Sequence, residues 1–195
     1  SGICRCKGAG MNTGILPIFF SRGRGPGGVL IRAGIGSPWA HCGILHGSLA
    51  LEATVPRVAT PPARELLAQL RRAHPGRPLH ELAAIGWVEM PAPRQALNFA
   101  YGQAGKGYDW AGALGVGFRR DWQRPDQWFC SELIAAACAH GGKPLFHADA
   151  GRVSPWDLWV CGQVVRGPDL VDEEMFSGDW IVSHWAAHAS AGRGG

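Results

Sequence analysis

The sequence predicts an α+β fold in which an antiparallel sheet packs against a helix. Two apolar runs, 41–46 and 49–55, flank Gly47-Ser48 with the spacing of a β-hairpin. A third apolar run, 83–90, is typical of a buried strand. The segment 128–140 has helical periodicity and is followed by two glycines, which commonly end a helix.

The elements in the N-terminal half follow from the positions of glycine and proline. Apolar runs at 15–20 and 28–32 are separated by a glycine-rich stretch, which predicts two strands around a loop. After Pro61-Pro62, leucines at helical spacing predict a helix over 63–74. A second helix is expected over 93–104, where small and apolar residues share one face.

The C-terminal half is less regular. Residues 105–127 are rich in Gly and Trp and predict an irregular segment. Beyond Pro155 we expect a short helix and one or two strands, including residues 180–182.

Length and composition indicate a single domain. The chain has 195 residues, 46 % of them hydrophobic, which is enough for one full core. We place this domain at 11–188. Residues 1–10 precede the first methionine and are expected to be a leader or an expression scar, and residues 189–195 a flexible tail.

The charge and hydropathy of the sequence limit the kinds of partner that the protein can have. The net charge is +4, and the arginines are scattered rather than arranged in a run, so we predict no nucleic-acid partner. The apolar stretch 14–20 contains Pro17 and is too short to span a bilayer, so no transmembrane segment is predicted. No stretch is typical of a signal peptide, which predicts synthesis in the cytoplasm. The oligomeric state is left open.

No cofactor or metal site is predicted. The six cysteines include no CxxC pair, and Cys138 and Cys161 lie in apolar surroundings typical of core thiols. His184 and His188 have the helical spacing of metal ligands, but no acidic residue or cysteine pair accompanies them. The glycine groups match neither a dinucleotide-binding nor a Walker A pattern.

Cys130 is the first candidate for chemistry. It lies in the first turn of the predicted helix 128–140, where the helix dipole and unpaired N–H groups favour a thiolate. The same N–H groups could bind an oxyanion. The alternative is a buried helix cysteine with no reactive role.

His41 and Glu52 are the candidates for its partners. In a hairpin turning at 47–48, directly opposed residues have numbers that sum to 95, and 41 and 52 sum to 93, so these two are plausible cross-strand neighbours. A strand histidine can meet a helix-terminal cysteine, and a carboxylate can orient the imidazole. Glu52 could instead be a solvated strand residue, and His46 is the competing third member.

Five short motifs occur in an order that resembles one known family. They are Ser37-Pro38-Trp39-Ala40-His41-Cys42-Gly43-Ile44, Leu51-Glu52-Ala53, Gly107-Tyr108-Asp109-Trp110, Phe129-Cys130-Ser131-Glu132-Leu133 and Val153-Ser154-Pro155-Trp156-Asp157-Leu158. Together they resemble the circularly permuted branch of the NlpC/P60 papain-like superfamily, and within it the YiiX/YaeF-like hydrolases. Lecithin:retinol acyltransferase is a more distant relative.

This resemblance implies a papain-like cysteine hydrolase whose sheet packs on a helix that starts at the nucleophile. Cys130 would be the nucleophile, His41 the general base and Glu52 its orienting partner. Tyr108 would lie near the oxyanion, or else pack against the cleft wall. Cys42 follows His41 on a strand and is expected to point away from it as a core filler.

The implied substrate is an amide bond in peptidoglycan stem peptides, cut by an amidase or endopeptidase. A phage lysis system or a secretion machine would then deliver the enzyme to the cell wall. The alternatives are a lipid-directed thioesterase or acyltransferase of the same fold, and a binding module that has lost catalysis.

Overall fold

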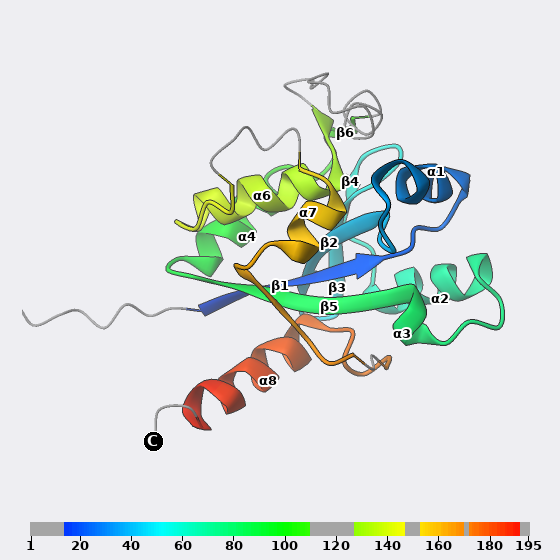
Figure 1. Ribbon diagram of the computed structural model, residues 1–195. Coiled ribbons are helices and arrows are strands. Elements are labelled where there is room, and N and C mark those ends of the chain that lie inside the picture. The colour runs from blue at the N-terminus through cyan, green and yellow to red at the C-terminus, as the bar shows by residue number, and fades with distance from the viewer. Residues whose placement is uncertain (1–13, 110–126, 147–152, 170–171, 192–195) are drawn as a thin grey trace, which may run out of the picture.

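The computed structural model describes residues 14–109, 127–146, 153–169 and 172–191. Its main sheet consists of β1 (Gly14–Ser21), β2 (His41–His46), β3 (Leu49–Ala53), β4 (Val58–Ala59), β5 (Ala83–Met90) and β8 (Val164–Arg166). The strands lie in the order β4–β3–β2–β1–β5–β8, and every neighbouring pair is antiparallel (Figure 1). Two short strands, β6 (Gly107–Tyr108) and β7 (Gln127–Trp128), form a separate parallel pair.

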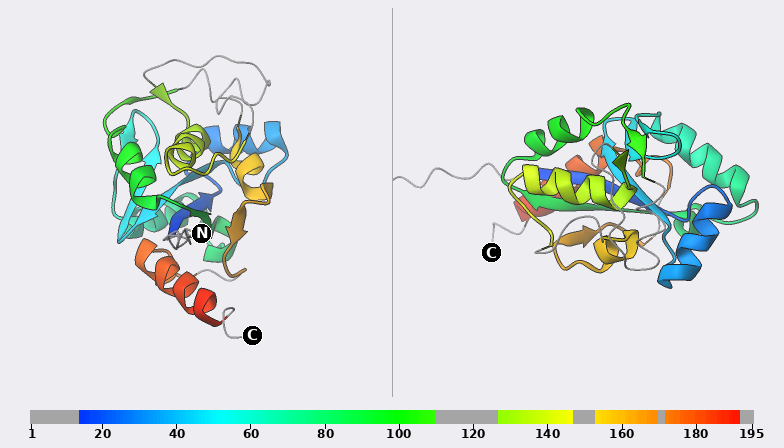
Figure 2. Two further views of the ribbon diagram at one scale, coloured as in Figure 1. Left: turned by 90° about the vertical axis from the view of Figure 1, so that its left-hand side faces the viewer. Right: turned by 90° about the horizontal axis from the view of Figure 1, so that it is seen from above.

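Seven helices occur in the described ranges. They are α1 (Pro26–Ile35), α2 (Ala63–Ala73), α3 (Leu79–Leu82), α4 (Pro93–Tyr101), α6 (Cys130–His140), α7 (Pro155–Val160) and α8 (Gly178–Ala191). Helices α4, α6 and α7 cover one face of the sheet, and α2, α3 and α8 cover the other (Figures 1 and 2). The predicted α+β class with an antiparallel sheet is confirmed.

Two hydrophobic cores lie on the two faces of the sheet. Successive side chains of a strand point to opposite faces, so β1 contributes to both. Leu16, Ile18 and Phe20 belong to the core beneath α4, α6 and α7. Ile15 and Phe19 belong to the core beneath α2, α3 and α8. Strand β1 is therefore buried on both faces, which explains why its sequence is almost continuously apolar.

The β2–β3 hairpin has the register expected from the sequence. Ile44 pairs with Leu51, so opposed residues sum to 95, and Gly47 in the turn has a φ of 56°. This register makes His41 and Glu52 diagonal neighbours, within reach of long side chains. Gly43 lies between them, and a Cβ there would come within 2.5 Å of the Phe19 ring. Glycine is thus required for β2 to approach β1 at this point.

Two sequence predictions were wrong about element type. The run 28–32 is part of α1 rather than a strand, because Gly36 in the left-handed conformation (φ 64°) ends a helix whose Ile31 and Ile35, four residues apart, pack on the core. Residues 180–182 lie in α8 rather than in a strand. Ser177 precedes α8, and its hydroxyl accepts a hydrogen bond from the Trp180 N–H at 3.1 Å, which is the geometry of a helix N-cap.

Several predictions fall partly outside the described residues. These include the leader 1–10 and most of the segment 105–127. Helix α8 runs to Ala191, into the segment expected to form the tail.

Candidate active site

Cys130 is the first residue of α6, and its side chain is 1 % exposed. Two contacts fix this helix start. The Glu132 carboxylate accepts a hydrogen bond from the Phe129 N–H at 3.2 Å, and the Ser131 hydroxyl donates to the carbonyl of Val153. The sulfur is therefore held rigidly at the end of the helix where the backbone N–H groups are unpaired.

His41, the first residue of β2, lies between Cys130 and Glu52. Its Nε2 is 2.6 Å from Glu52 Oε2. Cys130 acts on the same ring, because its charge and hydrogen bonding raise the pKa of His41. Because Nε2 faces the carboxylate, Nδ1 is the nitrogen that remains for the sulfur. A serine triad uses the opposite assignment, with Nε2 toward the nucleophile.

Glu52 is 1 % exposed and is held by two cations. Arg24 Nη2 donates to Glu52 Oε1 at 2.9 Å, while His41 occupies the other oxygen. The same guanidinium also donates to Gln69 Oε1 at 2.6 Å and to Thr54 Oγ1 at 3.1 Å. A buried carboxylate needs such compensation. Sequence reasoning missed Arg24, which it treated as one of several scattered arginines.

Cys42 is a core residue, as expected, and it also acts on Cys130. Its thiol is buried in the core as predicted, but it is more than a filler, because hydrogen bonding from its side chain and backbone lowers the pKa of Cys130. His41 and Cys42 are consecutive on β2 and both reach the same sulfur. Cys42 pairs with Phe20 and lies in the core that contains Cys130, whereas the His41 ring lies beside Phe19 of the opposite core. The two neighbours therefore do face opposite sides of the sheet, as expected for consecutive strand residues.

These contacts shift three pKa values. Burial alone raises the pKa of Cys130, but hydrogen bonds from Cys42 and the charge and hydrogen bond of His41 lower it well below its ordinary value. Burial lowers the pKa of His41, but Cys130 and Glu52 outweigh it and raise that pKa to about 9. Burial raises the pKa of Glu52, but His41 and Arg24 bring it below its usual value. The site therefore favours a thiolate, an imidazolium and a carboxylate in a row.

Tyr108 lies beside this row, on β6. Burial raises the pKa of its hydroxyl, and the negative charge of Cys130 raises it further. Its ring contacts that of Phe129, with centroids 6.2 Å apart. Tyr108 is thus close enough to the sulfur to feel its charge, and its phenol keeps its proton at neutral pH.

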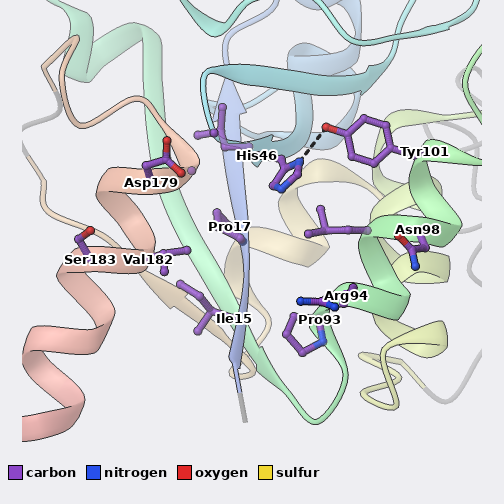
Figure 3. Close-up of a pocket in the computed structure, with 14 residues that line it drawn as sticks. Ile15, Pro17, His46, Pro93, Arg94, Asn98, Tyr101, Asp179, Val182 and Ser183 are labelled. Atoms are coloured by element: carbon purple, nitrogen blue, oxygen red, sulfur yellow. Dashed lines mark hydrogen bonds between the residues drawn. The ribbon is translucent and has the colours of Figure 1, made fainter. Parts of the chain in front are cut away.

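His46, the competing third member, lies at the other end of β2. It is exposed, and its Nδ1 is 2.9 Å from the hydroxyl of Tyr101 on α4. It lines a cavity of about 640 Å³ between β1, α4 and α8 (Figure 3). His46 is therefore not part of the Cys130 cluster, which contains Glu52 instead.

The last motif plays a structural part. Ser154 caps α7, accepting from the Asp157 N–H at 3.1 Å, while Asp157 Oδ2 accepts from the Ser154 N–H at 2.8 Å. The next turn places Trp159 against Trp39, with ring centroids 5.5 Å apart. Through this contact, the motif helps to fix the position of Trp39 and of the chain just before His41.

Among the described residues, no group of three or more His, Cys, Asp or Glu side chains is placed to hold a metal ion. His184 stacks on Trp180, with centroids 4.6 Å apart, and the side chain of His188 lies outside the description. None of the described helices is both long and apolar enough to cross a membrane.

The fold and the site together define an α+β protein in which a buried histidine is hydrogen-bonded to a buried glutamate and lowers the pKa of a buried cysteine. Neither a protein-family model nor a curated protein sequence matches the chain. Among solved structures it is similar to the metalloprotein YiiX from Escherichia coli O157:H7. The two share 15 % identity with a TM-score of 0.57, over 80 % of this chain and 96 % of that one. At this identity, the similarity shows a shared fold.

Proposed function

We propose that the protein is a papain-like cysteine hydrolase of the permuted NlpC/P60 type, with residues 11–188 as its catalytic domain. Cys130 is the nucleophile, His41 the general acid and base, and Glu52 the group that orients His41. The observation that carries the proposal is the series Arg24–Glu52–His41, in which each side chain is hydrogen-bonded to the next, together with the buried Cys130, whose pKa His41 lowers. A shared fold with YiiX supports it.

The chemistry follows from this series. The Cys130 thiolate attacks the carbonyl carbon, and the C=O electron pair moves to oxygen, where N–H groups at the start of α6 and the Tyr108 hydroxyl stabilise it. His41 gives its proton to the leaving amine or alcohol as the tetrahedral intermediate collapses to a thioester. His41 then takes a proton from water, which attacks the thioester and releases the acid. Cys130 leaves as the thiolate, and the proton stays on His41.

An amide in a peptidoglycan stem peptide is the first candidate substrate. A lipid-directed thioesterase or acyltransferase activity is the second, favoured by the cluster of arginines around Arg24, which suits a phosphate-bearing substrate. The deciding experiment incubates the protein with purified peptidoglycan and, separately, with phospholipids and acyl thioesters. Mass spectrometry then identifies which bond is cut. The proposal fails if all these substrates survive treatment with folded protein.

Replacing Glu52 by glutamine is expected to lower kcat/KM by about 10- to 1,000-fold, which is less than the roughly 10,000-fold loss for the corresponding change in a serine triad. Glutamine keeps the shape but removes the charge that stabilises the imidazolium. Because the ion pair with Cys130 already exists in the ground state, this loss is smaller than in a serine enzyme. Steady-state kinetics measure the effect, with exposed Glu65→Gln as the matched control. A Glu52→Gln variant as active as the parent would exclude Glu52 from the mechanism.

Cys130 is expected to react with iodoacetamide fastest of the four described cysteines. Its pKa is lowered, so Cys130 is already a thiolate at neutral pH. Its labelling rate should therefore change little between about pH 6 and 8, whereas the rate of an ordinary thiol rises with pH in that range. Burial raises the pKa of Cys42 and Cys138, so these stay protonated. Peptide mapping after brief labelling measures each site. Equal labelling of all three would show that Cys130 is not activated.

Hydrolysis should lose activity as the pH rises through about 9, the raised pKa of His41. Above it the imidazole is neutral and cannot protonate the leaving group. The pH profile of kcat/KM measures this limb. A profile that is still level well above that pH would contradict the assignment of His41 as the acid.

A further inference from the structure

A second site lies next to the first. The segment after β1, the outer side of α1 and the end of α2 enclose a cavity of about 400 Å³. Its lining contains four arginines and one histidine but no carboxylate: Arg22, Arg24, Arg32, His74 and Arg77. This is a strongly cationic lining for so small a space.

The positive charge of this cavity is only partly matched. Arg24 is paired with Glu52, and Arg77 with Glu81 at 2.8 Å on the surface. Arg22 and Arg32 have no acidic partner within the described ranges, and the buried Nε of Arg22 has no hydrogen-bond acceptor there. Arg32 donates to the carbonyl of Arg22, which brings the two cations together.

The like charges of these arginines repel one another, which bears on the pKa of Arg32. Burial lowers its pKa, and the nearby charges of Arg22 and Arg77 lower it further. A bound dianion would remove this repulsion and supply the missing acceptors. A phosphate group fits, because its oxygens match the fork of guanidinium donors.

Helix α1 presents an apolar surface beside the cavity. Leu30 is 71 % and Val29 is 53 % exposed, the highest values among the large hydrophobic side chains described. Val29 also lines the cavity. The opposite side of α1 packs on the core through Ile31 and Ile35. Figures 1 and 2 show α1 at the periphery of the molecule, near the end of β1.

We propose that α1 docks on an anionic phospholipid surface, with a lipid phosphate in the arginine cavity and Leu30 and Val29 at the boundary of the acyl chains. Exposed apolar side chains beside unmatched arginines are the combination that interfacial helices use. A soluble phosphate would use the arginines and leave the apolar pair without a role. The inference goes beyond the hydrolase and does not depend on Cys130.

Vesicle flotation tests the proposal on the full chain. The vesicles are phosphatidylcholine alone, or phosphatidylcholine mixed four to one with phosphatidic acid. The protein should float with the mixed vesicles only, and less at high salt. Arg32→Gln should lower the bound fraction about 5-fold, the effect expected of one basic residue near a charged surface. Leu30→Ser should also lower it, because it removes an apolar side chain from the boundary of the acyl chains. The matched control is Arg72→Gln, an exposed arginine of α2 outside the cavity, which should bind as the parent does.

Any of four results would overturn the proposal. They are no flotation with either vesicle, equal flotation with both, equal losses in Arg32→Gln and Arg72→Gln, and a Leu30→Ser variant that binds as well as the parent. Thermal stabilisation by inorganic phosphate without vesicle binding would show a site for free phosphate instead. Leu30 is exposed, so Leu30→Ser keeps the test decisive even if Arg32→Gln fails to fold. Because flotation needs no catalysis, its failure is distinct from failure of the hydrolase.

Discussion

Replacing Cys130 by alanine should abolish hydrolysis, lowering kcat by roughly 10,000-fold or more, the order of loss seen when a covalent nucleophile is removed. The thioester cannot form without the sulfur, so whichever substrate the mass-spectrometric screen identifies should remain intact. Single-turnover assays with that substrate measure the loss directly.

The control for this variant is Cys138→Ala, on the same helix. Cys138 is fully buried like Cys130, but it lies two turns away from the cluster. Its replacement leaves a small cavity and should cost about 1 kcal/mol of stability while leaving kcat/KM near the parental value. If the two variants lose activity equally, the effect is one of folding, and the nucleophile is misassigned.

Replacing His41 by alanine should be nearly as damaging, on the order of a 1,000-fold loss or more in kcat/KM. The substitution removes the cation that holds Cys130 as a thiolate and the proton donor for the leaving group. It also leaves the buried Glu52 with Arg24 alone, so the melting temperature should fall as well. Kinetics and thermal unfolding, measured together, separate the two effects.

His46 supplies the matched control. It is a histidine at the other end of the same strand, exposed and bonded only to Tyr101 among the contacts described for its side chain. His46→Ala should retain parental activity. An inactive His46→Ala variant beside an active His41→Ala variant would reverse the assignment of the two residues.

The hairpin illustrates what the sequence could predict. Gly47-Ser48 marks the turn, and the number of residues between it and each apolar position fixes the register, so the proximity of His41 and Glu52 followed by counting. The end of α6 was equally accessible, because two glycines follow the helical run, but the helix begins at Cys130 rather than at the predicted residue 128, since Trp128 lies in β7.

What could not be predicted depends on contacts between distant segments. Arg24 meets Glu52 across 28 positions of sequence, and nothing near either residue signals the pair. Cys42 meets Cys130 because α6 abuts the end of β2, which no periodicity reports. The apolar run in α1 contains β-branched residues, which favour a strand. The segment is nevertheless a helix, because one helical face packs on the core and Gly36 ends the helix.

The position of β2 within the sheet determines how local unfolding affects the candidate active site. Strand β2 lies between β1 and β3, away from both sheet edges, and it carries His41 and Cys42. Local openings begin at termini and edges, and interior strands give up their hydrogen bonds only when the whole domain unfolds. The amides in the middle of β2 are therefore expected to exchange among the slowest in the described chain. The reacting groups are preorganised for as long as the domain itself remains folded.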